Sequence, residues 1–146
     1  TTPLVWFDLG SGGGSPAIPL RIVRPLAHLT MVESKARKAA FLREAARVLG
    51  LAAVTVSPRR IEDSSLDPQP FAAGPSSDAG TADLVTIRAV RLTPKLARPI
   101  AAMLKPHGKL FLFEAADFEP PVLEGLTICE RHTLSASASL HILARI

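Results

Sequence analysis

The 146 residues suit one domain, and 47% apolar against 21% charged residues exclude an intrinsically disordered chain. No apolar run reaches the roughly 18 residues of a membrane span and the start lacks the order of a signal peptide, so we expect a cytoplasmic protein without membrane contact. Lysine and arginine outnumber aspartate and glutamate by 17 to 13, and the resulting net charge of +4 and isoelectric point near 9.8 favour a polyanionic partner such as nucleic acid.

Five apolar runs of strand length follow one another along the chain. They lie at 4–9, 29–32, 53–56, 84–87 and 110–113, with helical or loop segments between them. The runs are continuous instead of alternating, which is typical of strands buried on both faces. The pattern therefore predicts an α/β domain with a largely parallel sheet and helices on each side. The first run begins after only three residues, which indicates a fragment or a truncated protein.

Two helices are predicted between these strands. The first spans 35–49 and ends at Gly50. The residues of its apolar stripe, which we expect to face the core, are Phe41, Leu42, Ala45, Val48 and Leu49. The second spans 94–104 and begins with Pro94 in its first turn, and Pro99 should disturb it.

Turn and loop signals separate the remaining elements. The Pro-His-Gly sequence at 106–108 predicts the turn into the strand at 110–113. Segment 62–81 is rich in Ser, Pro, Gly and Asp and has no periodicity, which predicts a long, mobile surface loop. The tail, 122–146, predicts two more strands in an antiparallel hairpin at the sheet edge.

Cysteine and histidine are too sparse to predict a metal site. Cys129 is the only cysteine, so it cannot form an internal disulfide, and we expect it to pack in the core. The four histidines show no i, i+4 spacing on a predicted helix. We therefore predict no bound metal.

A glycine-rich segment directly after the first strand is the strongest motif in the chain. It consists of Asp8-Leu9-Gly10-Ser11-Gly12-Gly13-Gly14. Glycines at a strand-to-helix turn let the backbone approach a ligand closely, and the helix N-terminus presents free N–H groups. A flexible loop is the alternative interpretation, which the strand-turn-helix context disfavours.

Two classes of nucleoside cofactor fit such a turn. The dinucleotide motif Gly-x-Gly-x-x-Gly is matched only in part, because Ser15 or Ala17 stands where the third glycine is required. Asp8 lies two residues before the first glycine, where its charge would repel a pyrophosphate but attract the ammonium and sulfonium groups of S-adenosylmethionine. The methyl donor is therefore favoured over a nicotinamide cofactor.

Glu33 closes the second predicted strand, 25 positions after Asp8. A carboxylate there can accept hydrogen bonds from both ribose hydroxyls of either cofactor. The alternative is an acid at a helix N-terminus that is stabilised by the helix dipole. Together with the glycine turn, the ribose is the favoured interpretation.

Four motifs occur in a fixed order over residues 8–90. They are the glycine turn with the following Ser15-Pro16-Ala17-Ile18-Pro19-Leu20, then Glu33-Ser34 with Arg37-Lys38 and Phe41-Leu42, then Arg60-Ile61-Glu62, and then Arg88-Ala89-Val90. In sequence and order they resemble the glucose-inhibited division protein B family of small-subunit ribosomal RNA guanine-7 methyltransferases. The Pro-x-Ile-Pro ending is much more specific than the glycines.

The resemblance implies one Rossmann-like class I methyltransferase domain over 1–146, with a mostly parallel seven-stranded sheet, that binds S-adenosylmethionine and acts on 16S ribosomal RNA. The cofactor-binding residues that it implies are Asp8, Gly10, Gly12, Gly14, Ser15, Glu33, Ile61, Glu62 and Arg88. Arg88, at the end of the fourth strand, would contact cofactor or RNA, with a surface ion pair as the alternative. Arg37 and Lys38 would contact RNA, with a solvated helix face as the alternative.

Methylation at the 7-nitrogen of guanine agrees with the absence of an obvious catalytic triad. That nitrogen carries a free lone pair in the neutral base, so it can attack the methyl group without a general base. Positioning is then most of catalysis, and we nominate no catalytic acid or base.

Three departures from the family pattern keep two alternatives open. Ala17 replaces a glycine, Glu114-Ala115 replaces the Lys-Gly that usually follows the fifth strand, and the family's N-terminal helical region is missing. The alternatives are a methyltransferase for a small molecule or a protein, and a relative that binds cofactor or RNA without turnover.

Overall fold

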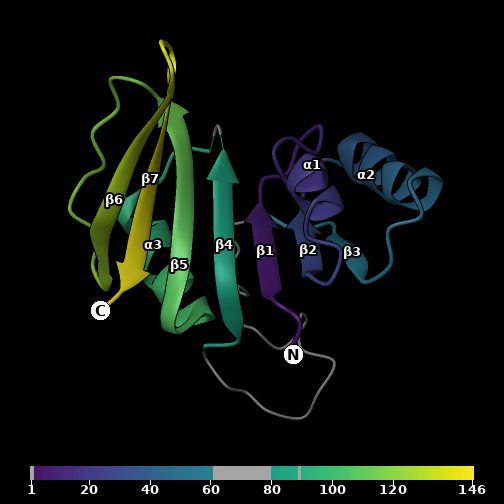
Figure 1. Cartoon of the computed structure of the whole chain (residues 1–146), viewed down its shortest axis with the longest axis horizontal. Coiled ribbons are helices and arrows are strands. Elements are labelled where there is room, and N and C mark those ends of the chain that lie inside the picture. The colour runs from purple at the N-terminus through teal and green to yellow at the C-terminus, as the bar shows by residue number, and fades with distance from the viewer. Residues whose placement is uncertain (1, 61–79, 89) are drawn as a thin grey trace.

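In the computed structural model, which describes residues 2–60, 80–88 and 90–146, seven strands form one sheet in the order β3-β2-β1-β4-β5-β7-β6 (Figure 1). The strands are β1 (Val5–Leu9), β2 (His28–Val32), β3 (Val54–Ser57), β4 (Ala82–Arg88), β5 (Leu104–Ala115), β6 (Leu126–Ser135) and β7 (Ala138–Arg145). β1 to β5 are parallel, whereas β7 runs antiparallel to both β5 and β6. The predicted α/β sheet with an antiparallel C-terminal hairpin is confirmed.

The described chain enters the sheet at its centre and extends it first to one side and then to the other. From β1 it passes outward to β2 and β3, and later it returns to the other side of β1 as β4 and β5. In an open parallel sheet, ligands bind at the carboxyl ends of the strands beside such a reversal of strand order. The ends of β1 and β4, where Leu9 pairs with Ile87, therefore mark the expected ligand site.

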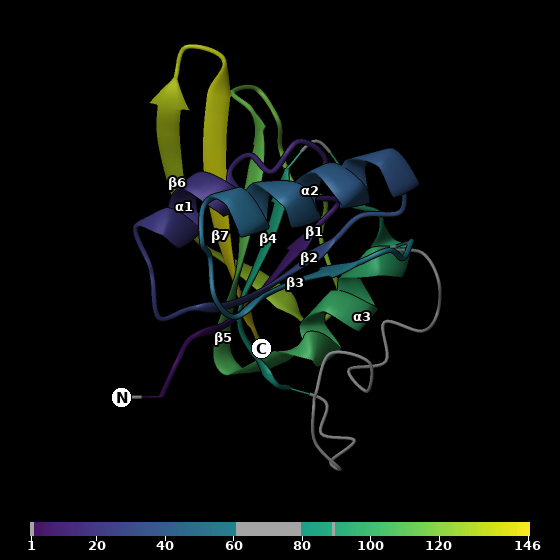
Figure 2. The same cartoon turned by 90° about the vertical axis from the view of Figure 1, so that its right-hand side faces the viewer.

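Helices cover both faces of the sheet (Figure 2). α1 (Ala17–Ile22) and α2 (Ala36–Val48) lie on one face, and α3 (Pro94–Met103) lies on the other. Under α1 and α2 the core is built around Trp6 and Met31, which are at most 2% exposed. The larger cluster lies on the opposite face, under α3, and draws residues from β1, β4, β5 and β7.

α2 buries a different stripe from the one predicted. Its buried residues are Ala39, Leu42 and Ala46, spaced i, i+3 and i+7. Three predicted members of the stripe are half or more exposed instead: Phe41, Val48 and Leu49. The small alanines let the helix approach the sheet closely, so the larger apolar residues on the neighbouring face point outward. The predicted stripe was right only in part.

β5 begins directly after α3, well before the predicted strand. Pro99 lies inside α3 without ending it. The predicted turn at 106–108 is instead an irregular stretch within β5, where the register against β4 shifts and His107 takes a φ of 69°. A Cβ on Gly108 would lie 2.9 Å from the carbonyl oxygen of Ala82, so glycine is required for this close approach to β4.

Two further predictions concern the outer parts of the chain. Cys129 is exposed on β6, so its predicted place in the core was wrong; β6 is the last strand of the sheet and has a neighbouring strand on one side only. The predicted loop at 62–81 lies outside the described residues except for its last two positions.

Among the described helices, none has the length and apolar character needed to cross a membrane.

Candidate active site

The glycine-rich segment forms a tight turn between β1 and α1. Gly10, Gly12 and Gly14 have φ of 70°, 55° and 88°, in the left-handed region that favours glycine. The backbone N–H groups of Gly10 and Ser11 donate to the carbonyl oxygen of Val32 at 2.8 and 3.1 Å. These bonds fix the turn against the carboxyl end of β2.

The glycines of the turn have different surroundings. A Cβ on Gly14 would lie 2.6 Å from Ile18 Cδ1 and 3.2 Å from Leu42 Cδ2, so Gly14 lets the turn pack against α1 and α2. A Cβ on Gly13 would meet nothing within 4 Å, and one on Gly12 would meet only a backbone oxygen at 3.9 Å. The outer face of the turn is therefore open, which leaves room for a ligand beside the backbone.

Asp8 lies beneath the turn in a buried polar network. It is 2% exposed, and its carboxylate accepts hydrogen bonds from Thr86 Oγ1 and Ser11 Oγ, both at 2.5 Å. Trp6 Nε1 in turn donates to Thr86 Oγ1 at 2.8 Å. Desolvation raises the pKa of Asp8 to about 6, although the two hydroxyl donors oppose it. The network joins β1, β4 and the turn.

This burial predicts a pH-dependent contribution of Asp8 to stability. Because folding raises the pKa of the acid, the folded state disfavours its ionised form, and stability falls as the pH rises from about 4 to about 6. Between pH 5 and pH 7 we expect Asp8 to lower the free energy of unfolding by about 1 kcal/mol. Asp8→Asn should lack this pH-dependent contribution to the free energy of unfolding. Urea unfolding of both proteins at each pH measures it, and equal pH slopes would contradict the prediction.

Glu33, at the carboxyl end of β2, faces the turn. Its Oε2 accepts a hydrogen bond from the N–H of Gly12 at 2.8 Å, and its Oε1 accepts one from the N–H of Lys35 at 3.1 Å. Lys35 is the N-cap residue of α2, so Glu33 does lie at a helix N-terminus. It is also in the wall of the groove described next, and its carboxylate has further lone pairs for a ligand. The geometry is compatible with both interpretations of this residue.

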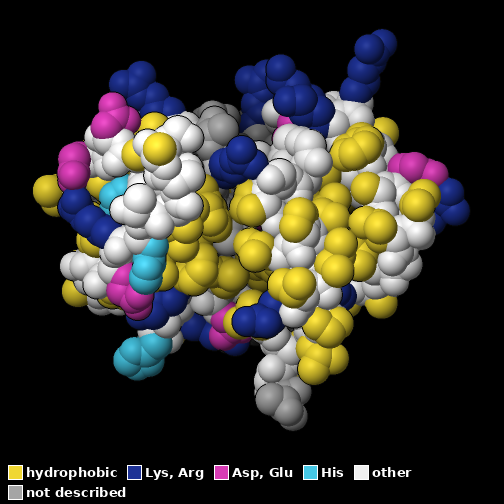
Figure 3. Space-filling model, turned by 45° about the horizontal axis from the view of Figure 1, so that its top comes forward, with side chains coloured by type: hydrophobic (Ala, Val, Ile, Leu, Met, Phe, Trp, Pro, Cys, Tyr) yellow, Lys and Arg dark blue, Asp and Glu magenta, His cyan; other side chains and the backbone are white. Residues whose placement is uncertain are grey.

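A groove of about 320 Å³ runs along the carboxyl ends of β1, β2 and β4. Its lining residues are Gly10, Gly12, Val32, Glu33, Ser34, Lys38, Arg59, Arg60, Arg88 and Val90. The volume lies within the range of about 300 to 1,000 Å³ that is typical of small-molecule sites. In Figure 3, which brings this end of the sheet forward, Lys and Arg side chains gather along the upper edge above a hollow lined by apolar side chains.

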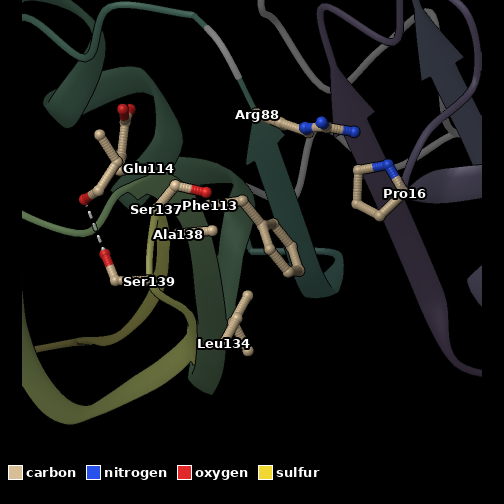
Figure 4. Close-up of a pocket in the computed structure, with 9 residues that line it drawn as sticks. Pro16, Arg88, Phe113, Glu114, Leu134, Ser137, Ala138 and Ser139 are labelled. Carbon is tan, nitrogen blue, oxygen red and sulfur yellow. Dashed lines mark hydrogen bonds between the residues drawn. The ribbon is translucent and has the colours of Figure 1, made fainter.

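A second cavity, of about 640 Å³, lies over the carboxyl ends of β4 and β5 and against the β6–β7 hairpin (Figure 4). Its lining residues are Pro16, Arg88, Phe113, Glu114, Ala115, Leu134, Ser137, Ala138 and Ser139. Arg88 lines both spaces, and its Nη1 donates a hydrogen bond to Ser15 Oγ at 2.7 Å. The groove and the cavity therefore meet at Arg88.

Sequence comparison assigns a family to the chain that carries this site. The family model for GidB, described as rRNA small subunit methyltransferase G, matches residues 2–138. The chain belongs to the GidB family. This confirms the resemblance to the glucose-inhibited division protein B family, and S-adenosylmethionine is the cofactor of that family.

Individual GidB-family relatives share between 32% and 45% of their aligned residues with this chain. The ribosomal RNA small subunit methyltransferase G of Roseiflexus sp. (strain RS-1) is 36% identical over 129 residues, which cover 88% of this chain and 52% of the relative. The protein of the same name from Acidiphilium cryptum (strain JF-5) is 45% identical over 101 residues, 69% of this chain and 40% of the relative. The chain spans about half the length of the curated relatives it matches.

Solved structures of other proteins share the fold of this GidB-family chain. The mitomycin 7-O-methyltransferase MmcR superposes with a TM-score of 0.76 at 16% identity, over 99% of this chain and 49% of that one. A putative methylase from Haemophilus influenzae gives 0.72 at 16% identity, over 99% and 88% of the two chains. TrmN from Thermus thermophilus gives 0.73 at 15% identity, over 99% and 45%. The fold is that of the class I methyltransferases, as predicted.

The structure places five of the eleven predicted site residues of this GidB-family chain in the wall of one groove. Those in its wall are Gly10, Gly12, Glu33, Lys38 and Arg88. Ser15 lies beside Arg88, Gly14 lies on the side of the turn that packs against α1 and α2, and Asp8 lies beneath the turn, so neither Gly14 nor Asp8 is in the groove wall. A role of Asp8 toward a ligand would thus act through the turn and not by direct contact.

Other predicted residues lie elsewhere. Arg37 is exposed on α2 and lines neither space. Ile61 and Glu62 fall outside the described residues, so their predicted contact with the cofactor stays a prediction. Within the described ranges, no group of three or more His, Cys, Asp or Glu side chains is placed to hold a metal ion.

Sequence reasoning missed several residues around the site. Thr86 pairs with Asp8 across β1 and β4, and the signal for it was a polar residue within the apolar run at 84–87. Phe113, in the wall of the second cavity, carried no such signal, because an apolar residue in a strand predicts only packing. Pro16, in the same wall, was noted only within the motif that carries the family resemblance.

Proposed function

We propose that this chain transfers the methyl group of S-adenosylmethionine to the 7-nitrogen of a guanine in 16S ribosomal RNA. One observation carries the proposal: Arg88 lines both the groove beside the glycine turn and the larger cavity over β4 and β5. Two adjoining spaces can hold the two substrates of a group transfer so that their reacting atoms meet. Family membership and the basic edge of the groove favour RNA as the second substrate.

The residues of the groove fit a nucleoside methyl donor. Open space faces Gly12 and Gly13, where a Cβ would meet no side chain within 4 Å, so a ligand can approach the backbone of the turn. Glu33 keeps lone pairs for ribose hydroxyls beyond the two that accept backbone N–H groups. When bound, S-adenosylmethionine supplies a methyl group on a positively charged sulfur, which leaves as a neutral thioether.

The chain's own part in the reaction is to position the base. The guanine 7-nitrogen needs no general base, so the residues have to bring it in line and exclude water. Phe113 and Pro16 give the cavity apolar walls. Arg88 is held by Ser15 at the opening between the two spaces, where the reacting atoms would have to meet.

Transfer to RNA tests the proposal directly. The chain is incubated with methyl-labelled S-adenosylmethionine and with small-subunit ribosomal RNA that lacks 7-methylguanosine, both as naked RNA and as assembled particles. We expect labelled 7-methylguanosine in the RNA. Cofactor binding without transfer to either form would contradict the proposal and favour the alternatives, a methyltransferase for a small molecule or a protein or a relative without turnover.

Replacement of Glu33 should weaken cofactor binding. Glu33→Gln keeps one acceptor oxygen for the N–H of Gly12 but loses the charge and the second acceptor, which faces the N–H of Lys35. We expect about 10-fold lower affinity, as for one charge-assisted hydrogen bond. Glu44→Gln is the control, because Glu44 lies on the exposed face of α2 in an ion pair with Arg47. Isothermal titration with S-adenosylmethionine measures both. An unchanged affinity of Glu33→Gln would exclude the ribose role.

A further inference from the structure

Glu114 occupies a distinctive place in the second cavity. It is the penultimate residue of β5, where it pairs with Ser139 of β7, and it lines the cavity together with Arg88 and Phe113. In the view of Figure 4, Glu114 lies on one side and Arg88 and Pro16 on the other, with the ring of Phe113 between them. A carboxylate thus lies at the end of the cavity away from the groove.

The carboxylate of Glu114 has no partner among the described residues. No described side chain or backbone N–H donates a hydrogen bond to it, and it forms no ion pair there. The guanidinium in the same cavity, that of Arg88, donates to Ser15 Oγ at 2.7 Å instead. Burial raises the pKa of Glu114, which indicates that water solvates this carboxyl incompletely. A partly desolvated acceptor that no protein group satisfies gains free energy when a ligand supplies the donor.

We infer that Glu114 accepts hydrogen bonds from the N1–H and the 2-amino group of the target guanine. The inference rests on the proposed function and names the residue that selects the base. A carboxylate offers two acceptor oxygens side by side. Among the four RNA bases, guanine alone presents two adjacent N–H donors on its Watson–Crick edge, the edge by which proteins recognise bases that are turned out of a stack.

The orientation of the base agrees with the reaction. The 7-nitrogen lies on the side of the purine opposite the 2-amino group. A guanine bound to Glu114 through its Watson–Crick edge therefore directs this nitrogen away from Glu114, toward the side where the cavity meets the groove at Arg88. Phe113, half-buried in the same wall, offers a face on which a base can stack.

Inosine provides the test, because it keeps the 7-nitrogen and N1–H of guanosine and lacks only the 2-amino group. The methylated nucleotide is first located, and small-subunit RNA is then assembled by ligation with guanosine or inosine at that position. Single-turnover rates with S-adenosylmethionine are measured for the original chain, Glu114→Gln and Glu114→Ala. The control is Glu124→Gln, since Glu124 is exposed and its nearest charged partner is Arg98, at 3.6 Å.

The original chain and the control should prefer guanosine about 10-fold or more, while both Glu114 variants should bring the ratio to within about 3-fold. Melting temperatures and cofactor affinities of the variants report whether the fold is retained. An unchanged ratio in both Glu114 variants, or no preference in the original chain, would overturn the inference and leave the proposed function intact. Cofactor binding without methylation of any RNA would instead remove the proposed function, and the inference with it.

Discussion

A Gly12→Arg variant is expected to bind S-adenosylmethionine on the order of 100-fold more weakly than the original chain, a loss of about 2.7 kcal/mol. Gly12 lines the groove, and a Cβ there would meet only a backbone oxygen at 3.9 Å, so the new side chain has room only in the space that the ligand needs. Its guanidinium would also add to the charge of Lys38 and Arg88 and repel the cationic methionine end.

Backbone strain has to be separated from this effect, because Gly12 has a φ of 55°. Gly50 provides a matched control, with a φ of 63°, nothing within 4 Å of its Cβ, and a place after α2 that does not line the groove. Gly50→Arg should lose a similar stability, about 1 kcal/mol, and keep its full affinity. Isothermal titration and urea unfolding of both variants distinguish the two effects. Normal binding by Gly12→Arg would show that the turn is not the cofactor site.

Gly14→Val should produce the largest loss of stability, about 3 kcal/mol or more. Its Cβ would lie 2.6 Å from Ile18 Cδ1 and 3.2 Å from Leu42 Cδ2, and both neighbours belong to the core beneath α1 and α2. Overpacking of this kind costs about 1 to 3 kcal/mol, and a left-handed backbone at a non-glycine residue adds about 1 to 2 kcal/mol. Urea unfolding measures the change.

Gly13→Ala is the control for that prediction. Gly13 belongs to the same turn, but a Cβ there would meet nothing within 4 Å, and its φ is not in the left-handed region. We expect its stability to change by about 0.5 kcal/mol at most. If Gly14→Val were as stable as Gly13→Ala, the turn would not pack against α1 and α2 as described.

Much of the sheet could be predicted because its parallel strands are buried on both faces and therefore form continuous apolar runs. Each of the first four strands lies within two residues of its predicted bounds. The hairpin was also predicted, although β6, at the edge, is mostly exposed. The early start of β5 could not be predicted, because it depends on how closely Gly108 approaches the backbone of Ala82 in β4.

The burial of α2 shows where a periodic pattern is ambiguous. Two apolar stripes run along this helix, one with Phe41 and Val48 and one with Ala39 and Leu42. Hydrophobicity alone favours the larger residues. The structure buries the other stripe, because alanines allow a shorter distance between helix and sheet, and this distance is a property of the packed domain and not of the segment.

The candidate site could also be predicted only in part. The glycine turn, Glu33 and Arg88 could be predicted, because each is a local signal at the end of a strand, and the topology brings the ends of β1, β2 and β4 together. The cavity around Phe113 and Glu114 could not be predicted, since it is formed by β4, β5 and the hairpin together. Glu114 was noted only as a departure from the family's pattern.

The shared position of Arg88 has a thermodynamic consequence. A side chain that borders two binding spaces couples them, and any factor by which bound cofactor changes the affinity for RNA must equal the factor by which bound RNA changes the affinity for cofactor. Typical couplings of about 1 to 3 kcal/mol amount to about 5-fold to 150-fold. With positive coupling, the chain would hold its methyl donor most tightly when the base is in place, and would release the spent donor more readily once the RNA has left.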